Sequence, residues 1–287
     1  MKKKLLFLLI ILIIPFIVGG CANDSMDEIE IIVTNYPNEY IVRSLYGNHS
    51  TITSIYPDGV ETDTYKISKK QKQEYAKKDL FVYNGLIKKE RDLAMELLAI
   101  NHDLRIIDTA YVLETEYSPE ELWLNPSSLL MMSQNVRRSL SEYSSSSYLK
   151  KDVDEAYDEL KISLSELDAE YRLASESTNN KTIIVADSAL KYLEKFGLEV
   201  ICIDDDATQK TVSDAENLIN SGAVSYVFKF QGDELGETAS NIVNNSGIST
   251  IDLHKLDNIT DQERSEKDDY ISIMKDNLES IKKELYQ

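Results

Sequence analysis

Short apolar segments alternate with longer amphipathic ones along most of this 287-residue chain. Apolar runs bounded by helical patterns are typical of a parallel sheet whose two faces are covered by helices. The pattern therefore predicts an α/β fold, with four strands in each half of the chain. The predicted strands are 31–34, 51–56, 80–83 and 105–108, followed by 182–185, 198–203, 226–230 and 250–253.

One long helical pattern separates the two halves. Apolar residues recur every three or four positions from Leu149 to Ala174 against a charged background, which is the stripe of an amphipathic helix. At 1.5 Å per residue this helix is about 38 Å long, more than a crossover between neighbouring strands needs. We predict two Rossmann-like α/β lobes, 30–143 and 181–287, joined by a backbone helix over 148–176. Ligands of such sheets bind beyond the carboxyl ends of the strands, so we expect the ligand cleft between the lobes.

The N-terminal residues have the features of a secretory signal. Three lysines after Met1 precede an apolar run from Leu5 to Val18 and then Gly19-Gly20-Cys21. This order is typical of a signal peptide, and the apolar run is shorter than a membrane span needs. Small residues directly before a cysteine fit a lipoprotein peptidase. We expect a signal peptide over 1–20, lipidation of Cys21 and an anchored tether over 21–29. The alternative is an ordinary signal with a chance cysteine.

Charge and motif content exclude some classes of protein. The 50 acidic and 31 basic residues give a formal charge of −19, and removal of the signal lysines makes it −22. Such a surface repels nucleic acid and steers cations inward, although solubility explains it equally well. Cys202 would be the one mature cysteine besides Cys21, so no disulfide framework is expected. The sequence offers neither a glycine-rich nucleotide motif after a strand nor a nucleophile with base and orienting group. We therefore predict that the protein is not an enzyme.

Five segments follow one another along the chain: Ile32–Pro37, Tyr56–Tyr65, Lys78–Gly85 (ending in Tyr-Asn-Gly), Glu121–Pro126 and a closing helix from Asp269. In their order and spacing they resemble the solute-binding components of zinc and manganese ABC importers. Ile32–Pro37 is like the first strand and turn of that family, Tyr56–Tyr65 is like its Pro-x-Gly-Val-Asp-Pro-His-x-Tyr, and Glu121–Pro126 is like its His-x-Trp-Leu-Asp-Pro. The resemblance covers nearly the whole mature chain. It implies a protein that captures a divalent cation between its lobes and delivers it to a membrane permease.

The resemblance also implies a metal site at four positions where the family uses histidines and acids. The matching residues are Asp63, Glu121, Ala186 and Asp252, and Asp187 is the neighbour that can replace Ala186. None of them is a histidine. Converging carboxylates suit manganese, calcium or magnesium better than an imidazole-rich site does, and zinc still binds oxygen donors. In so acidic a chain the same residues also need no role beyond solubility.

The three histidines offer little help to such a site. His49 and His102 fall in polar turns that we expect to be solvated, whereas His254 lies two residues after Asp252 and is an alternative ligand. Trp123 is expected to pack near the cleft.

These observations favour an extracytoplasmic, monomeric solute-binding lipoprotein, anchored to a bacterial cell membrane through Cys21. Its partner is an ABC permease, with no role for nucleic acid, and its ligand is a divalent metal ion, zinc or manganese. The departures at the ligand positions leave an alternative open. In that case the chain is a diverged member of the scaffold that acts as a surface interaction protein or binds another small solute.

Overall fold

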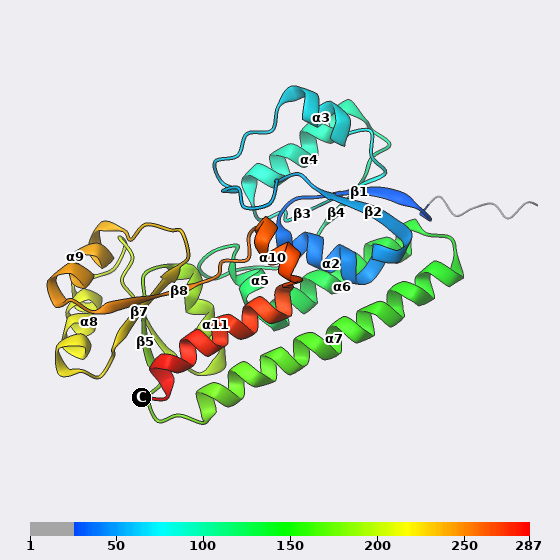
Figure 1. The fold of residues 1–287 in the computed structure, drawn as a ribbon. Coiled ribbons are helices and arrows are strands. Elements are labelled where there is room, and N and C mark those ends of the chain that lie inside the picture. The colour runs from blue at the N-terminus through cyan, green and yellow to red at the C-terminus, as the bar shows by residue number, and fades with distance from the viewer. Residues whose placement is uncertain (1–25) are drawn as a thin grey trace, which may run out of the picture.

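The computed structural model describes residues 26–287, and its centre is a pair of parallel four-stranded sheets (Figure 1). Both sheets have the same strand order, β2-β1-β3-β4 in the first and β6-β5-β7-β8 in the second. This confirms the predicted α/β class with two sheet lobes. The strands are β1 (Ile29–Val33), β2 (Ser50–Ser54), β3 (Leu80–Tyr83), β4 (Arg105–Asp108), β5 (Thr182–Val185), β6 (Glu199–Cys202), β7 (Tyr226–Phe230) and β8 (Ser249–Leu253).

Helices connect the strands within each lobe. Polar side chains cap several of them, as in α2, where Asn35 Oδ1 accepts a hydrogen bond from the Asn38 amide, and in α6, where Asn125 Oδ1 accepts from the Ser127 amide and Pro126 takes the first helical position. The first lobe holds α2 (Tyr36–Tyr46), η2 (Gly47–His49), α3 (Lys69–Tyr75), α4 (Lys88–Ile100), α5 (Glu121–Leu124) and α6 (Pro126–Tyr143), and the second holds η3 (Ser188–Phe196), α8 (Gln209–Ser221), α9 (Glu237–Ser246), α10 (Asp261–Glu266) and α11 (Tyr270–Leu285).

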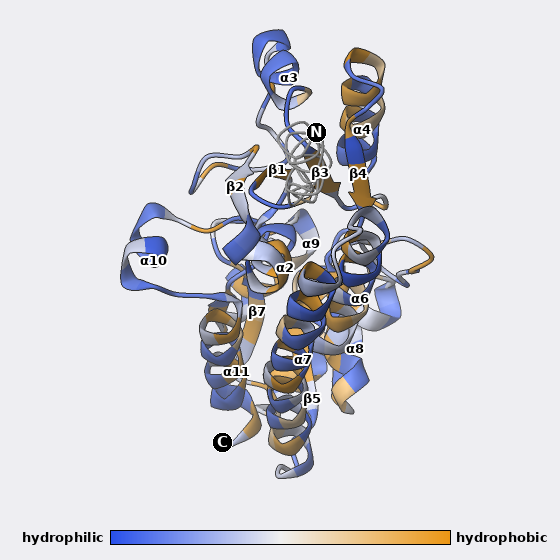
Figure 2. Cartoon of the chain, turned by 90° about the vertical axis from the view of Figure 1, so that its right-hand side faces the viewer, coloured by the Kyte–Doolittle hydropathy of each residue, from blue (hydrophilic) through white to orange (hydrophobic). Residues whose placement is uncertain are grey.

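Helix α7 (Ser147–Glu176) runs along both lobes rather than only between them (Figure 1). It packs against α2 and α6 on one side of the molecule and against α11 on the other. Its buried stripe belongs to a hydrophobic core that continues from the first sheet to the second without a break. Figure 2 shows α6, α7 and α11 lying together, with polar and apolar residues alternating along each of them. The lobes are therefore joined by packing as well as by chain.

The predicted signal peptide and Cys21 lie outside the described residues. Within residues 26–287, no helix combines the length and the apolar character needed to cross a membrane. Cys202, expected in a buried strand, lies at the end of β6 and is half-buried.

Candidate functional site

A segment of the second lobe crosses onto the first lobe directly after β8. We call residues 254–264 the crossing segment. Its backbone bonds to the first lobe at several points, so the two lobes are held together where the strands end. The bonds are Trp123 Nε1 to the Lys255 carbonyl at 2.9 Å, the Tyr36 amide to the Asp257 carbonyl at 3.1 Å and the Gly59 amide to the Ile259 carbonyl at 2.8 Å.

A cavity of about 210 Å³ lies beneath this crossing. The first lobe contributes residues from the segments that follow β1, β2, β3 and β4, and the second lobe contributes Lys255 and Asp257 of the crossing segment. The cavity is therefore at the carboxyl ends of the first sheet and between the lobes, where open α/β sheets place their ligands. Its lining residues are Asn35, Tyr56, Thr62, Asp63, Leu86, Ile87, Lys88, Lys89, Glu90, Pro119, Glu120, Trp123, Lys255 and Asp257.

Four carboxylates line the cavity, and they come from both lobes. Asp63 is exposed on the loop after β2, Glu120 precedes α5 and Asp257 belongs to the crossing segment. Thr62 Oγ1 donates to Asp257 Oδ2 at 2.9 Å, which ties the loop after β2 to the second lobe. The arrangement offers oxygen donors from opposite sides of one small space.

Glu90 is the fourth of these acids and the most buried, with 2% of its surface exposed. Its Oε2 accepts hydrogen bonds from Thr34 Oγ1 at 2.6 Å and from the Asn84 amide at 2.7 Å. Burial disfavours the charged form, and although these hydrogen bonds oppose it, the pKa of Glu90 rises to about 7. The cavity wall therefore contains a carboxyl group that changes charge near neutral pH.

Two of the lysines that line the cavity differ in what holds them. The Lys89 ammonium donates to the carbonyls of Thr62 and Tyr65 at 2.6 and 2.7 Å, so it fastens the loop after β2. The Lys255 ammonium instead lies 3.6 Å from Asp233 Oδ2. Burial lowers the pKa of Lys255, but the carboxylates of Asp233, Asp257, Glu120 and Asp63 outweigh it and raise the pKa above its ordinary value.

Of the four carboxylates expected to bind metal, only Asp63 lines the cavity. Glu121 is buried on the other side of its turn, where its carboxylate accepts from the amides of Glu116, Tyr117 and Ser118. A carboxylate that accepts from three backbone donors closes a loop, and the role of Glu121 as a metal ligand stays a prediction. Its neighbour Glu120 faces the cavity in its place.

The second-lobe candidates also lie elsewhere. Asp252 is inside β8, as the predicted strand 250–253 implied, and its carboxylate pairs with Lys229 at 3.0 Å on the neighbouring strand. Asp187 caps η3, since its Oδ1 accepts from the Ala189 amide at 2.7 Å. Neither residue lines the cavity, and their roles as metal ligands stay predictions. Within the described part of the chain, no three histidine, cysteine, aspartate or glutamate side chains are positioned to hold a metal ion together.

Two of the three histidines, His49 and His254, contact other parts of the protein through their ring nitrogens. His254 is the first residue after β8, but its Nδ1 accepts from the Leu256 amide at 2.9 Å and its Nε2 lies 3.2 Å from Glu263. His49 is not solvated as expected, because its ring nitrogens face Asp152 at 3.1 Å and Asp27 at 3.4 Å. His102 is exposed, as its turn indicated.

Sequence reasoning missed Glu90, Glu120 and Asp257. Each follows a predicted strand or adjoins a candidate, which is a weak signal in a chain with 50 acids. Nothing local distinguishes Glu120 from Glu121, since only the direction of the turn decides which one faces the cleft.

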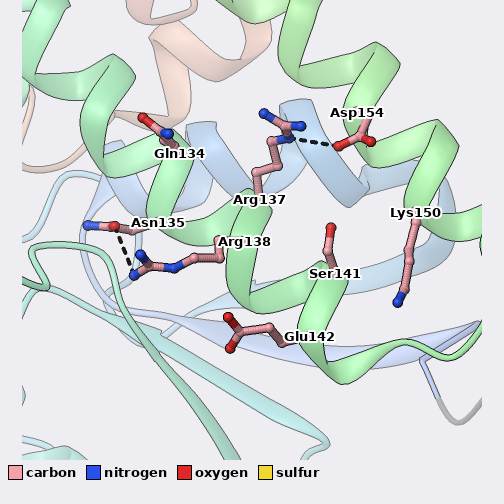
Figure 3. A pocket seen from close by; sticks show the side chains of 8 residues that line it. All are labelled: Gln134, Asn135, Arg137, Arg138, Ser141, Glu142, Lys150 and Asp154. Atoms are coloured by element: carbon pink, nitrogen blue, oxygen red, sulfur yellow. Dashed lines mark hydrogen bonds and ion pairs between the residues drawn. The ribbon is translucent and has the colours of Figure 1, made fainter.

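A larger hollow of about 620 Å³ lies between α6 and α7, away from the strand ends (Figure 3). Its charged groups are largely engaged with their own lobe, as Arg137 Nε pairs with Asp154 Oδ1 at 2.7 Å and Arg138 contacts Asn135 Oδ1 at 3.4 Å. It draws residues from neither the second lobe nor the sheet ends. The interlobe cavity remains the candidate site.

Comparison with known proteins agrees with this architecture. The family model described as the periplasmic zinc-uptake complex component A matches residues 31–284. The chain is 22% identical to the zinc-binding protein AdcA of Streptococcus pyogenes serotype M6, over 98% of this chain but 61% of that protein. It therefore spans about three fifths of the length of such relatives. It is also 22% identical to the high-affinity zinc uptake system protein ZnuA of Bacillus subtilis, over 99% of both chains.

Solved structures show the same fold. The metal-dependent lipoprotein YcdH of Bacillus subtilis superposes with a TM-score of 0.74 at 19% identity, covering 91% of this chain and all of that one. The ZnuA-like domain of Streptococcus pneumoniae AdcA, in its Zn(II)-bound form, gives 0.71 at 19% identity over 91% of this chain and all of that domain. These likenesses confirm the predicted two-lobe fold. With a family match across nearly all of the described residues, the chain belongs to the zinc-uptake complex component A family of solute-binding proteins.

Proposed function

We propose that this protein is the solute-binding component of a divalent-cation importer. It is extracytoplasmic, held at the membrane by lipid on Cys21, and acts as a monomer that delivers its cargo to an ABC permease. One observation carries the proposal: within a fold of the zinc-uptake family, acids from both lobes line a single interlobe cavity.

We propose that the cation site uses Asp63, Glu120 and Asp257, which line one cavity but are not positioned to hold an ion together in this structure, so they must move closer when the cation binds. Asp63 and Glu120 come from the first lobe and Asp257 from the crossing segment, so a bound cation would link the lobes. Carboxylates suit manganese and calcium and also bind zinc. Because the relatives are named for zinc, zinc is the first cargo to test.

Calorimetry with zinc, manganese and calcium, together with elemental analysis of the purified protein, tests the proposal. A cation present at 100 times its dissociation constant should stabilise the protein by about 2.7 kcal/mol. Asp257→Ala and Glu120→Ala should each shrink this gain sharply, because each removes an anionic donor. A melting temperature that none of the three metals raises would refute the proposal.

The adjacent residue Glu121 provides a matched control. Glu121→Ala should leave cation affinity unchanged and cost about 3 kcal/mol of stability, since three backbone amides lose their acceptor. Asp252→Ala should also leave affinity unchanged, because the Asp252 carboxylate pairs with Lys229. If either of these two variants lost cation binding while Asp257→Ala retained it, the cation would bind at the family's ligand positions and not at the site proposed here.

A further inference from the structure

The interlobe cavity already contains a cationic group, the side chain of Lys255. Lys255 lines the cavity together with Asp63, Glu120 and Asp257, and 22% of its side chain is exposed. The ammonium lies 3.6 Å from Asp233 Oδ2. One positive charge therefore lies at the wall of a cavity that carboxylates of both lobes also line.

The backbone that carries Lys255 is fastened on both sides. Its own carbonyl accepts from Trp123 Nε1 at 2.9 Å. The preceding residue, His254, exchanges two hydrogen bonds with the side chain of Asn277, at 2.7 and 2.9 Å. The position of the main chain is thus determined, and movement of the charge is left to the flexible methylene chain of the lysine.

Asp233 is the carboxylate with which Lys255 pairs in this structure. It lies in the loop after β7, its side chain is 37% exposed and it does not line the cavity. The Lys255 ammonium also lies 5.7 Å from the centre of the Phe230 ring, close to that loop. The Lys255 ammonium is therefore held on the Asp233 side of the cavity, where a cation on the cavity carboxylates would repel it.

We propose that Lys255, held by Asp233, is the resident counter-ion of the interlobe cavity, and that a divalent cation binds there in competition with its charge. This inference rests on the proposed function. In the empty protein Lys255 offsets the repulsion among carboxylates that face one another. On binding, the cargo must compete with a tethered charge, so Lys255 weakens affinity and excludes cations that attract the carboxylates less strongly than a divalent ion does.

Calorimetry with ZnCl₂ and MnCl₂ on Lys255→Met and the wild-type protein tests the competition. Lys275→Met is the matched control, because it removes one positive charge from an exposed pair on α11, away from the cavity. Removing a positive charge next to a divalent ion should lower the dissociation constant of Lys255→Met by about tenfold or more. The control should bind as the wild type does. Equal or weaker binding by Lys255→Met would overturn the inference.

A second measurement needs no metal. Without Lys255 the cavity carboxylates repel, so Lys255→Met should lower the melting temperature of the chelator-treated protein. Asp257→Asn keeps an acceptor for Thr62 but removes a charge. It should raise the melting temperature of the Lys255→Met variant by more than it raises that of the wild-type protein. Absence of this coupling would overturn the inference. Coupling without metal binding by any variant would instead refute the proposed function and leave Lys255 as the counter-ion.

Discussion

At the scale of a single residue, protonation of Glu90 should make the free energy of unfolding depend on pH. Its pKa is raised from 4.5 to about 7, with burial as the largest cause. Between these two pH values the folded state keeps a proton that the unfolded state has lost. The free energy of unfolding should therefore fall as pH rises through this window, by about 3 kcal/mol in all.

Glu90→Gln should abolish that decline, because the amide is neutral at every pH and its oxygen can accept from Thr34 and Asn84 as Glu90 does. Urea unfolding of chelator-treated protein at pH 5 and pH 8 measures the difference. The variant should match the wild type at pH 5 and exceed it at pH 8. Glu159→Gln, on an exposed helical face, is the control. A Glu90→Gln profile parallel to the wild type would contradict the assignment.

At the scale of the element, α7 stabilises the fold through one face only. Leu164 is 1% exposed and belongs to the core shared by the lobes, whereas Ile162, two positions away, is 60% exposed. Leu164→Ala should cost about 2–5 kcal/mol because it leaves a cavity in close-packed surroundings. Ile162→Ala should cost less than about 0.5 kcal/mol. Chemical denaturation of both variants provides the test, and equal losses would show that the stripe is not what holds α7 in place.

At the scale of the whole molecule, Arg264 links the two lobes through charged side chains. From α10 its guanidinium contacts both carboxylate oxygens of Asp58 at 2.6 and 2.7 Å and reaches buried Glu39 at 2.9 Å. The Arg264 side chain is 39% exposed, so solvent screens the pairs. We expect Arg264→Ala to cost about 1 kcal/mol.

The same change should speed hydrogen exchange of the Gly59 and Tyr36 amides, which donate to the crossing segment. Arg172→Ala, which breaks an exposed pair within α7, should leave those amides unaffected. Unchanged exchange in Arg264→Ala would show that the shared core alone keeps the lobes together. In that case the contacts of Arg264 with Asp58 and Glu39 are not needed to keep the two lobes together.

The sequence by itself determined the elements and the class of fold. The strands and the apolar stripe of α7 depend on residues that are close in the sequence, and the spacing of apolar residues indicates them directly. The family resemblance was equally readable, because it depends on ordered segments and not on their contacts.

Only the tertiary structure decided which charges face one another. Glu120 and Glu121 are neighbours with the same chemistry, yet one lines the cavity and the other closes a loop. Asp257 meets Thr62 across 195 residues of sequence, and Lys255 reaches the cavity only because the crossing segment docks on the first lobe. Such contacts depend on how the two lobes pack. That packing is determined by many core residues together, so the local pattern of residues does not indicate it.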